Sequence, residues 1–67
     1  MNVSINGARR HFDPPPATIA DLVRELKLEG KRIAVEKNGA IVPKSRYAET
    51  EVSDGDRLEI VGAVGGG

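Results

Sequence analysis

The atoms of this 67-residue chain that could do chemistry lie in its last residues. Gly65, Gly66 and Gly67 form a run of residues without a Cβ atom, and the run finishes at a main-chain carboxylate. Such a run can enter a narrow channel in another protein, because no side chain blocks a close backbone approach. At about 3.3 Å per residue, the segment 62–67 reaches about 20 Å beyond the body of the protein. We therefore expect a carboxylate presented as a substrate for another enzyme; a frayed end or a flexible linker is the alternative.

Side chains suited to catalysis are scarce in the rest of the chain. Cysteine is absent, which excludes disulfides, thiolate zinc sites and iron–sulfur clusters. The single histidine, His11, follows Arg9 and Arg10 without a carboxylate cluster, so we interpret it as a solvated strand residue. The run Asp54-Gly55-Asp56 lacks the further oxygen ligands of a calcium loop and is typical of a turn. We expect a protein that is not itself an enzyme and that binds neither a metal nor a cofactor.

Charge and hydropathy give a broad class. Ten basic residues balance ten acidic ones, which disfavours a cationic surface for nucleic acid. No apolar run approaches the roughly 18 residues that a membrane span needs. The N-terminal segment lacks the basic and then apolar signature of a signal peptide. We expect a cytoplasmic protein that is monomeric when free and binds neither nucleic acid nor membrane.

The elements that must position the glycines can be predicted from periodicity. Alternation of apolar and polar residues predicts strands at about 2–6, 9–12, 32–36, 40–42 and 57–61. Asn6-Gly7 and Asn38-Gly39 are favoured dipeptides for two-residue hairpin turns, because both positions tolerate a positive φ.

One helix is predicted between the second and third strands. Its apolar residues share one face at helical spacing: Ile19, Leu22, Val23 and Leu26. Thr18 is a candidate N-cap, and Asp21 can complete a capping box with it. We expect the helix over residues 19–28, with Gly30 as its C-terminal cap.

This order of elements favours an α+β domain. A single helix can cover one face of a mixed sheet of four to five strands, giving two layers over residues 1–62 with a flexible C-terminal tail at 63–67. By its residue type, Ile41 is a candidate for the core. In the last strand Arg57, Glu59 and Val61 alternate with the apolar Leu58 and Ile60, which places the first three on the outer face even though Val61 would also suit the core.

Several short motifs occur in a characteristic order along the whole chain: Asn6-Gly7, Thr18-Ile19-x-x-Leu22-Val23, Asn38-Gly39-x-x-Val42-Pro43, Asp54-Gly55-Asp56 and the terminal diglycine. In this order and spacing, the chain resembles the ThiS family of small sulfur-carrier proteins of thiamine biosynthesis. The resemblance implies a β-grasp (ubiquitin-like) fold.

The resemblance also implies a role for the last residues. In this family a ThiF-like activating enzyme uses ATP to adenylate the terminal carboxylate, here that of Gly67. The adenylate then accepts sulfur that comes from a cysteine desulfurase, and the resulting thiocarboxylate gives its sulfur to thiazole formation on a ThiG-like thiazole synthase. Gly66, Gly65 and Val64 would form the tail that threads into the partners' active sites. The carrier itself would bind no cofactor.

Docking to these partners is expected on the outer face beside the tail, at Val61, Glu59 and Arg57; an ordinary solvated strand face is the alternative. Three other functions fit the same features. The chain could carry sulfur for another pathway, such as molybdopterin synthesis. It could be a ubiquitin-like modifier, or a β-grasp interaction module that carries nothing.

Overall fold

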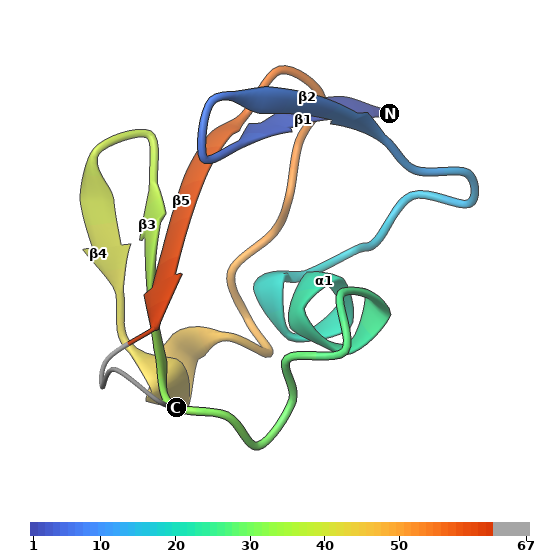
Figure 1. Cartoon of the computed structure of the whole chain (residues 1–67). Helices are drawn as coiled ribbons and strands as arrows, with labels where there is room; N and C mark the ends of the chain where they lie inside the picture. The colour runs from blue at the N-terminus through green and yellow to red at the C-terminus, as the bar shows by residue number, and fades with distance from the viewer. Residues whose placement is uncertain (63–67) are drawn as a thin grey trace.

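The alternating segments of the sequence form one mixed sheet. A computed structural model, which describes residues 1–62, contains five strands: β1 (Asn2–Ile5), β2 (Ala8–His11), β3 (Ile33–Lys37), β4 (Ala40–Val42) and β5 (Arg57–Gly62). Their order across the sheet is β2-β1-β5-β3-β4, so the last of these five strands lies at the centre (Figure 1). β5 runs parallel to β1 and antiparallel to β3. The predicted mixed sheet is confirmed, and each predicted strand boundary lies within one residue of the observed one.

The two hairpins of the sheet turn at Asn-Gly dipeptides, as predicted. Asn6 and Gly7 have φ values of 52° and 85°, and Asn38 and Gly39 have values of 52° and 89°. Positive φ at both central residues matches the right-handed twist of the flanking strands. Asn and Gly are the residues that adopt this conformation at the lowest cost, which explains why the chain reverses at these positions.

The one α-helix within residues 1–62, α1 (Ile19–Glu25), begins as predicted but ends earlier. Thr18 Oγ1 accepts a hydrogen bond from the Asp21 N–H at 3.2 Å, which confirms the N-cap. The prediction of a helix to Leu28 with a cap at Gly30 was wrong. Lys27 takes the left-handed conformation at φ 61°, and the Leu28 N–H then donates to the Val23 carbonyl at 2.9 Å. This C-terminal motif turns Leu28 back against the core, where it is partly buried.

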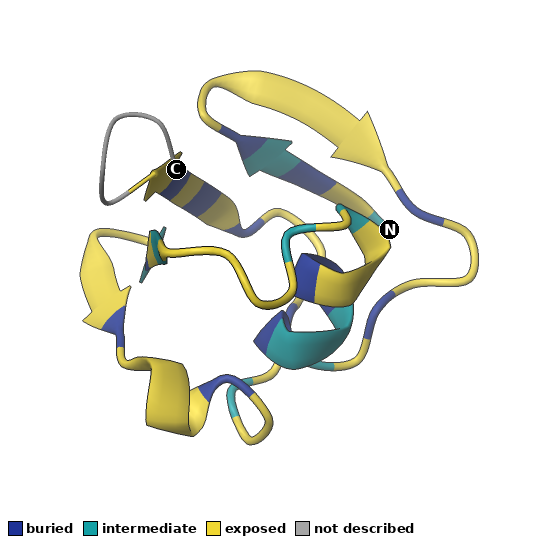
Figure 2. Cartoon of the chain, turned by 60° about the horizontal axis from the view of Figure 1, so that its bottom comes forward, coloured by how far each residue is buried: buried dark blue, intermediate teal, exposed yellow. Residues whose placement is uncertain are grey.

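The hydrophobic core lies between α1 and one face of the sheet (Figure 2). Its buried apolar members come from all the predicted elements and from the segment between β4 and β5: Val3, Ile5, Phe12, Ile19, Leu22, Val23, Val35, Val42, Tyr47, Val52, Leu58 and Ile60. Tyr47, which follows the short 3₁₀ helix η1 (Lys44–Arg46), was not predicted to be in the core. Ile41 was, and this prediction was wrong: it is 73% exposed, because its neighbour Val42 takes the inward position of β4.

Candidate functional site at the exit of the last strand

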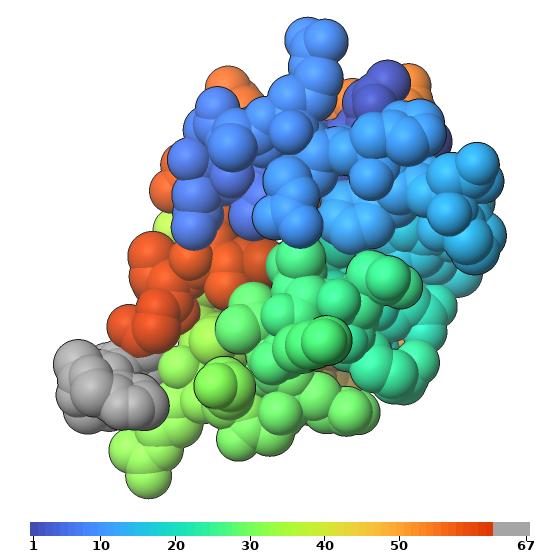
Figure 3. Space-filling model, turned by 45° about the vertical axis from the view of Figure 1, so that its right-hand side comes forward, coloured from blue at the N-terminus to red at the C-terminus, as the bar shows by residue number. Residues whose placement is uncertain are grey.

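The end of β5 is the place from which the glycine tail starts. Gly62 is opposite Ile33 in the β3–β5 register, and Val61 is opposite Ala34. The space-filling view shows the end of β5 at the surface, next to the start of β3 (Figure 3). The predicted site residues Val64, Gly65, Gly66 and Gly67 lie outside the described residues, as does the predicted tail 63–67, so their roles stay predictions.

Two asparagine side chains hold β5 in place. Asn6 Nδ2 donates to the Ile60 carbonyl at 2.9 Å, and Asn6 Oδ1 accepts from the Ile60 N–H at 2.8 Å. At the other end of the strand, Asn38 Oδ1 accepts from the Arg57 N–H at 2.8 Å. Each hairpin turn therefore carries an amide that pairs with the backbone of the central strand. The Asn-Gly dipeptides predicted both asparagines as turn residues only, and their hydrogen bonds to β5 were not predicted.

Asp56 fixes the turn that leads into β5. Its side chain is buried, and its carboxylate accepts hydrogen bonds from the Ser53 N–H at 2.8 Å and from Asn38 Nδ2 at 3.0 Å. Lys37 Nζ lies 3.6 Å from the same carboxylate. Burial tends to raise the pKa of Asp56, but the hydrogen bonds from Ser53 and Asn38 and the charge of Lys37 outweigh it and lower the pKa below its ordinary value. Asp56 is thus an ionised anchor and not a general acid.

The outer face of β5 carries the residues predicted to dock partners. Arg57, Glu59 and Val61 are all exposed, whereas Leu58 and Ile60 between them are buried against α1. The predicted orientation is therefore confirmed, while the docking role stays a prediction.

Neighbouring strands extend this face. Glu36 of β3 is directly opposite Glu59 of β5, and Ile41 of β4 is opposite Glu36. Sequence reasoning missed Glu36 and Ile41. Alternation with the buried Val35 places Glu36 on the outer face, but the residue that lies across from it depends on the strand register.

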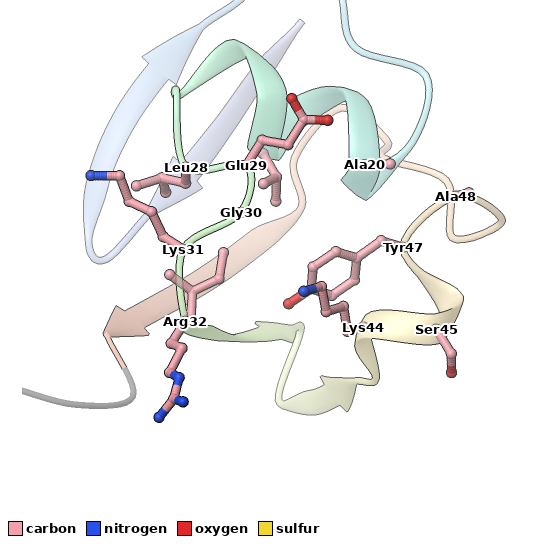
Figure 4. A pocket seen from close by; sticks show the side chains of 12 residues that line it. Ala20, Leu28, Glu29, Gly30, Lys31, Arg32, Lys44, Ser45, Tyr47 and Ala48 are labelled. Carbon is pink, nitrogen blue, oxygen red and sulfur yellow. The ribbon is translucent and has the colours of Figure 1, made fainter. Parts of the chain in front are cut away.

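A cavity of about 530 Å³ opens between the end of α1, the start of β3 and η1 (Figure 4). Leu28 and Tyr47 contribute apolar surface to it, and burial raises the pKa of the Tyr47 hydroxyl. The side chains of Lys31 and Arg32 point away from the cavity. Among the described residues, neither cysteine nor histidine lines it. It is an opening at the end of the two-layer core.

The remaining polar candidates have structural partners. His11 Nδ1 lies 2.8 Å from Asn2 Oδ1, and the Asn2 N–H donates to Asp54 Oδ1 at 2.7 Å. Asp54 and Asp56 therefore hold a turn, as predicted. Within residues 1–62 no three acidic or histidine side chains come together as a metal site. In the same part of the chain, α1 is far too short and polar to cross a bilayer.

Comparison with known proteins gives a consistent result along the chain. The sequence model of the ThiS family matches residues 3–67. The sulfur carrier protein ThiS of Bacillus subtilis is 42% identical over 65 residues, which cover 97% of this chain and 98% of that protein. The crystal structure of the thiamine biosynthesis protein ThiS of Geobacter metallireducens superposes with a TM-score of 0.86 at 30% identity and covers all of both chains.

A second kind of relative is much longer. The thiazole synthase of Paramagnetospirillum magneticum is 48% identical over 67 residues, which are the whole of this chain but only 20% of that protein. This chain thus spans about a fifth of the length of that relative.

Proposed function

Because this chain belongs to the ThiS family, we propose that it is a sulfur carrier for thiazole formation in thiamine biosynthesis, with the Gly67 carboxylate as the reacting group. One observation carries the proposal: the family match extends to residue 67 and so includes the three glycines at 65–67. The fold supports it, since the central strand β5 leads directly toward those glycines.

The chemistry follows from the weakness of a carboxylate as an electrophile. An oxygen of the Gly67 carboxylate attacks the α-phosphorus of ATP on a ThiF-like activating enzyme, and pyrophosphate leaves. The mixed anhydride that forms has AMP as a good leaving group. A thiol reductant releases sulfide from the persulfide of a cysteine desulfurase, and this sulfide displaces AMP to leave the thiocarboxylate. ATP belongs to the activating enzyme, so the carrier needs no cofactor of its own. In this scheme the chain is a protein co-substrate and not an enzyme.

The tail delivers this group to its partners. Val64, Gly65 and Gly66 enter the active site, while Arg57, Glu59 and Val61 remain on the outer face of the sheet as docking residues. A ThiG-like thiazole synthase is the proposed acceptor of the sulfur. The Paramagnetospirillum relative supports this pairing, because a segment similar to this chain forms a fifth of a protein named thiazole synthase.

Intact mass measurement tests the proposal. The protein is incubated with its activating enzyme, ATP, a cysteine desulfurase, cysteine and a thiol reductant, and we expect a gain equal to the mass difference between one sulfur and one oxygen atom. Deletion of Gly67 should abolish the gain. So should one alanine added after Gly67, which leaves the three glycines intact but moves the carboxylate onto another residue.

Each rival function gives a different result in the same experiment. A wild-type protein that neither forms an adenylate nor gains sulfur beside a competent activating enzyme would rule out the carrier role. Higher-mass conjugates resistant to reductant would indicate a ubiquitin-like modifier. Growth of a deletion strain restored by thiamine separates the thiamine pathway from molybdopterin synthesis.

A further inference from the structure

Two glutamates face each other on the outer face of the sheet without a cation between them. Glu36 and Glu59 are direct partners in the antiparallel β3–β5 register. Side chains in such positions have Cβ atoms about 4.5–5.5 Å apart, and like charges there destabilise a sheet. The four ion pairs within residues 1–62 include neither carboxylate. Arg57 lies two positions from Glu59 on the same face, but it is opposite Ser4.

Exposed apolar side chains flank this pair. Within residues 1–62, Ile41 and Val61 are the two large hydrophobic residues that are strongly exposed, at 73% and 56%. Ile41 is opposite Glu36, and Val61 follows Glu59 by two positions and is opposite Ala34. All these side chains point away from α1, because the residues that alternate with them in the three strands are buried: Val35, Val42 and Ile60. We call Glu36, Glu59, Ile41 and Val61 the acidic-apolar patch.

The patch adjoins the exit of the tail. Val61 precedes Gly62, the last residue of β5, so any enzyme that binds the tail must also lie near the patch. An enzyme that binds ATP needs cationic groups around the triphosphate. A pair of carboxylates next to the tail therefore complements the electrostatic field expected at the mouth of an adenylating site.

We propose that the acidic-apolar patch binds an arginine or lysine of the adenylating enzyme between the carboxylates of Glu36 and Glu59, with apolar side chains of that enzyme on Ile41 and Val61. This inference rests on the proposed function, because it needs an adenylating partner. Two residues of the patch, Glu36 and Ile41, lie outside β5. The partner must present a cationic side chain and apolar side chains to bind there.

The arrangement predicts opposite effects on folding and on docking. In the free protein the paired charges repel each other, and the incoming cation relieves this repulsion. Replacing both glutamates by glutamine keeps the size of the side chains and removes the charges. The Glu36→Gln/Glu59→Gln variant should therefore melt no lower than the wild type and still dock poorly.

The test is steady-state pyrophosphate exchange with the cognate adenylating enzyme and ATP, with the carrier concentration varied. For Glu36→Gln/Glu59→Gln we expect KM for the carrier to rise by about tenfold or more, as loss of a charge-assisted contact would cause. kcat should stay near the wild-type value, because the tail is unchanged.

Added salt should raise KM of the wild type more steeply than that of the variant, because salt screens the contact. Ile41→Ala should also raise KM with an unchanged melting temperature.

A matched control removes two other glutamates. Glu25→Gln/Glu29→Gln makes the same change in net charge at exposed positions on α1 and in the segment after it, away from the patch. Its KM should remain that of the wild type. An equal rise in KM for both double variants would show that only net charge matters and would overturn the inference.

The outcomes separate this inference from the proposed function. If the wild type supports no exchange at all, the proposed function fails. If the wild type is active and the patch variant keeps its KM and its salt dependence, the inference fails while the carrier role stands. A variant that loses binding only to the thiazole synthase would also overturn it, since the cation is assigned to the adenylating enzyme.

Discussion

At the scale of single residues, Asn6 and Asn38 each have two structural roles. Their backbones take the positive φ of a hairpin turn, and their amides bind the backbone of β5. Asparagine suits both, because it tolerates the left-handed region and carries a donor and an acceptor on one short side chain. The turns were predictable from the Asn-Gly dipeptides. The amide contacts join residues far apart in the sequence, so no local pattern could have indicated them.

Substitutions of Asn6 distinguish the contribution of its backbone conformation from that of its side-chain hydrogen bonds. Asn6→Gly keeps the positive φ but removes both hydrogen bonds to Ile60, and it should lower the free energy of unfolding by about 1–3 kcal/mol. Asn6→Ala should cost more, because alanine adds strain in the left-handed conformation. Urea unfolding followed by circular dichroism measures both values. A glycine variant as stable as the wild type would show that the amide contributes nothing.

Asp56 should give the fold an acid-sensitive component. Its pKa is lowered in the folded state, so the folded protein binds fewer protons than the unfolded chain at acid pH. The stabilisation is complete above the ordinary pKa of an aspartate and disappears as the pH falls through the lower folded-state value. Asp56→Asn should therefore be less stable than the wild type at pH 7, by about 1–3 kcal/mol, with a smaller difference near pH 3.

Unfolding in urea at the two pH values measures this difference, and Asp13→Asn at an exposed position is the control. If the difference in free energy of unfolding between the wild type and Asp56→Asn stays constant from neutral to acid pH, the lowered pKa of Asp56 does not contribute to stability.

At the scale of elements, the sequence predicted which segments are strands better than it predicted where the helix ends. Strand alternation and Asn-Gly turns are local signals, and all five strands were found. The helix was extended too far because a glycine at position 30 looked like a cap. In a continued helix Leu28 would lie on the side opposite Ile19, away from the apolar face. The structure places a lysine in the left-handed position instead, and residue type alone favours glycine there.

Lys27 should therefore be a position where a substitution can raise the stability of the protein. Lys27→Gly relieves the strain of a φ of 61° and should stabilise the protein by about 0.5–1 kcal/mol. In a domain of this size that corresponds to a rise in melting temperature of several degrees, about 4–8 °C per kcal/mol. Calorimetry measures the shift. Lys31→Gly, in the same connection but without a positive φ, should give no gain; equal gains for both would refute the explanation.

At the scale of the whole molecule, the candidate site combines predictable and unpredictable parts. The outward positions of Arg57, Glu59 and Val61 follow from alternation within one strand. Their neighbours Glu36 and Ile41 could not be assigned from one sequence, because a shift in register would bring different residues opposite β5. The patch exists only when three strands pair in this register.

Substitutions in the buried core should therefore lower stability, whereas substitutions on the outer face of the sheet should leave it nearly unchanged. Leu22→Ala removes a side chain that is 0% exposed and should cost about 2–5 kcal/mol. This is a large share of the stability of a small domain, which is about 0.05–0.15 kcal/mol per residue. Ile41→Ala, at a residue 73% exposed, should change the free energy of unfolding by less than about 0.5 kcal/mol. Denaturant titration of both variants tests the contrast, and an Ile41 variant as destabilised as Leu22→Ala would contradict it.

The central position of β5 has a consequence for synthesis on the ribosome. The β1–β2 and β3–β4 hairpins are joined in the sheet only through this strand, and it is translated after all the other elements of residues 1–62. A nascent chain halted before residue 57 would have both hairpins but not the strand that pairs with each of them in the sheet. The proposed docking surface thus cannot assemble until β5 has been translated, so premature termination products should be cleared by proteases instead of competing for the partner.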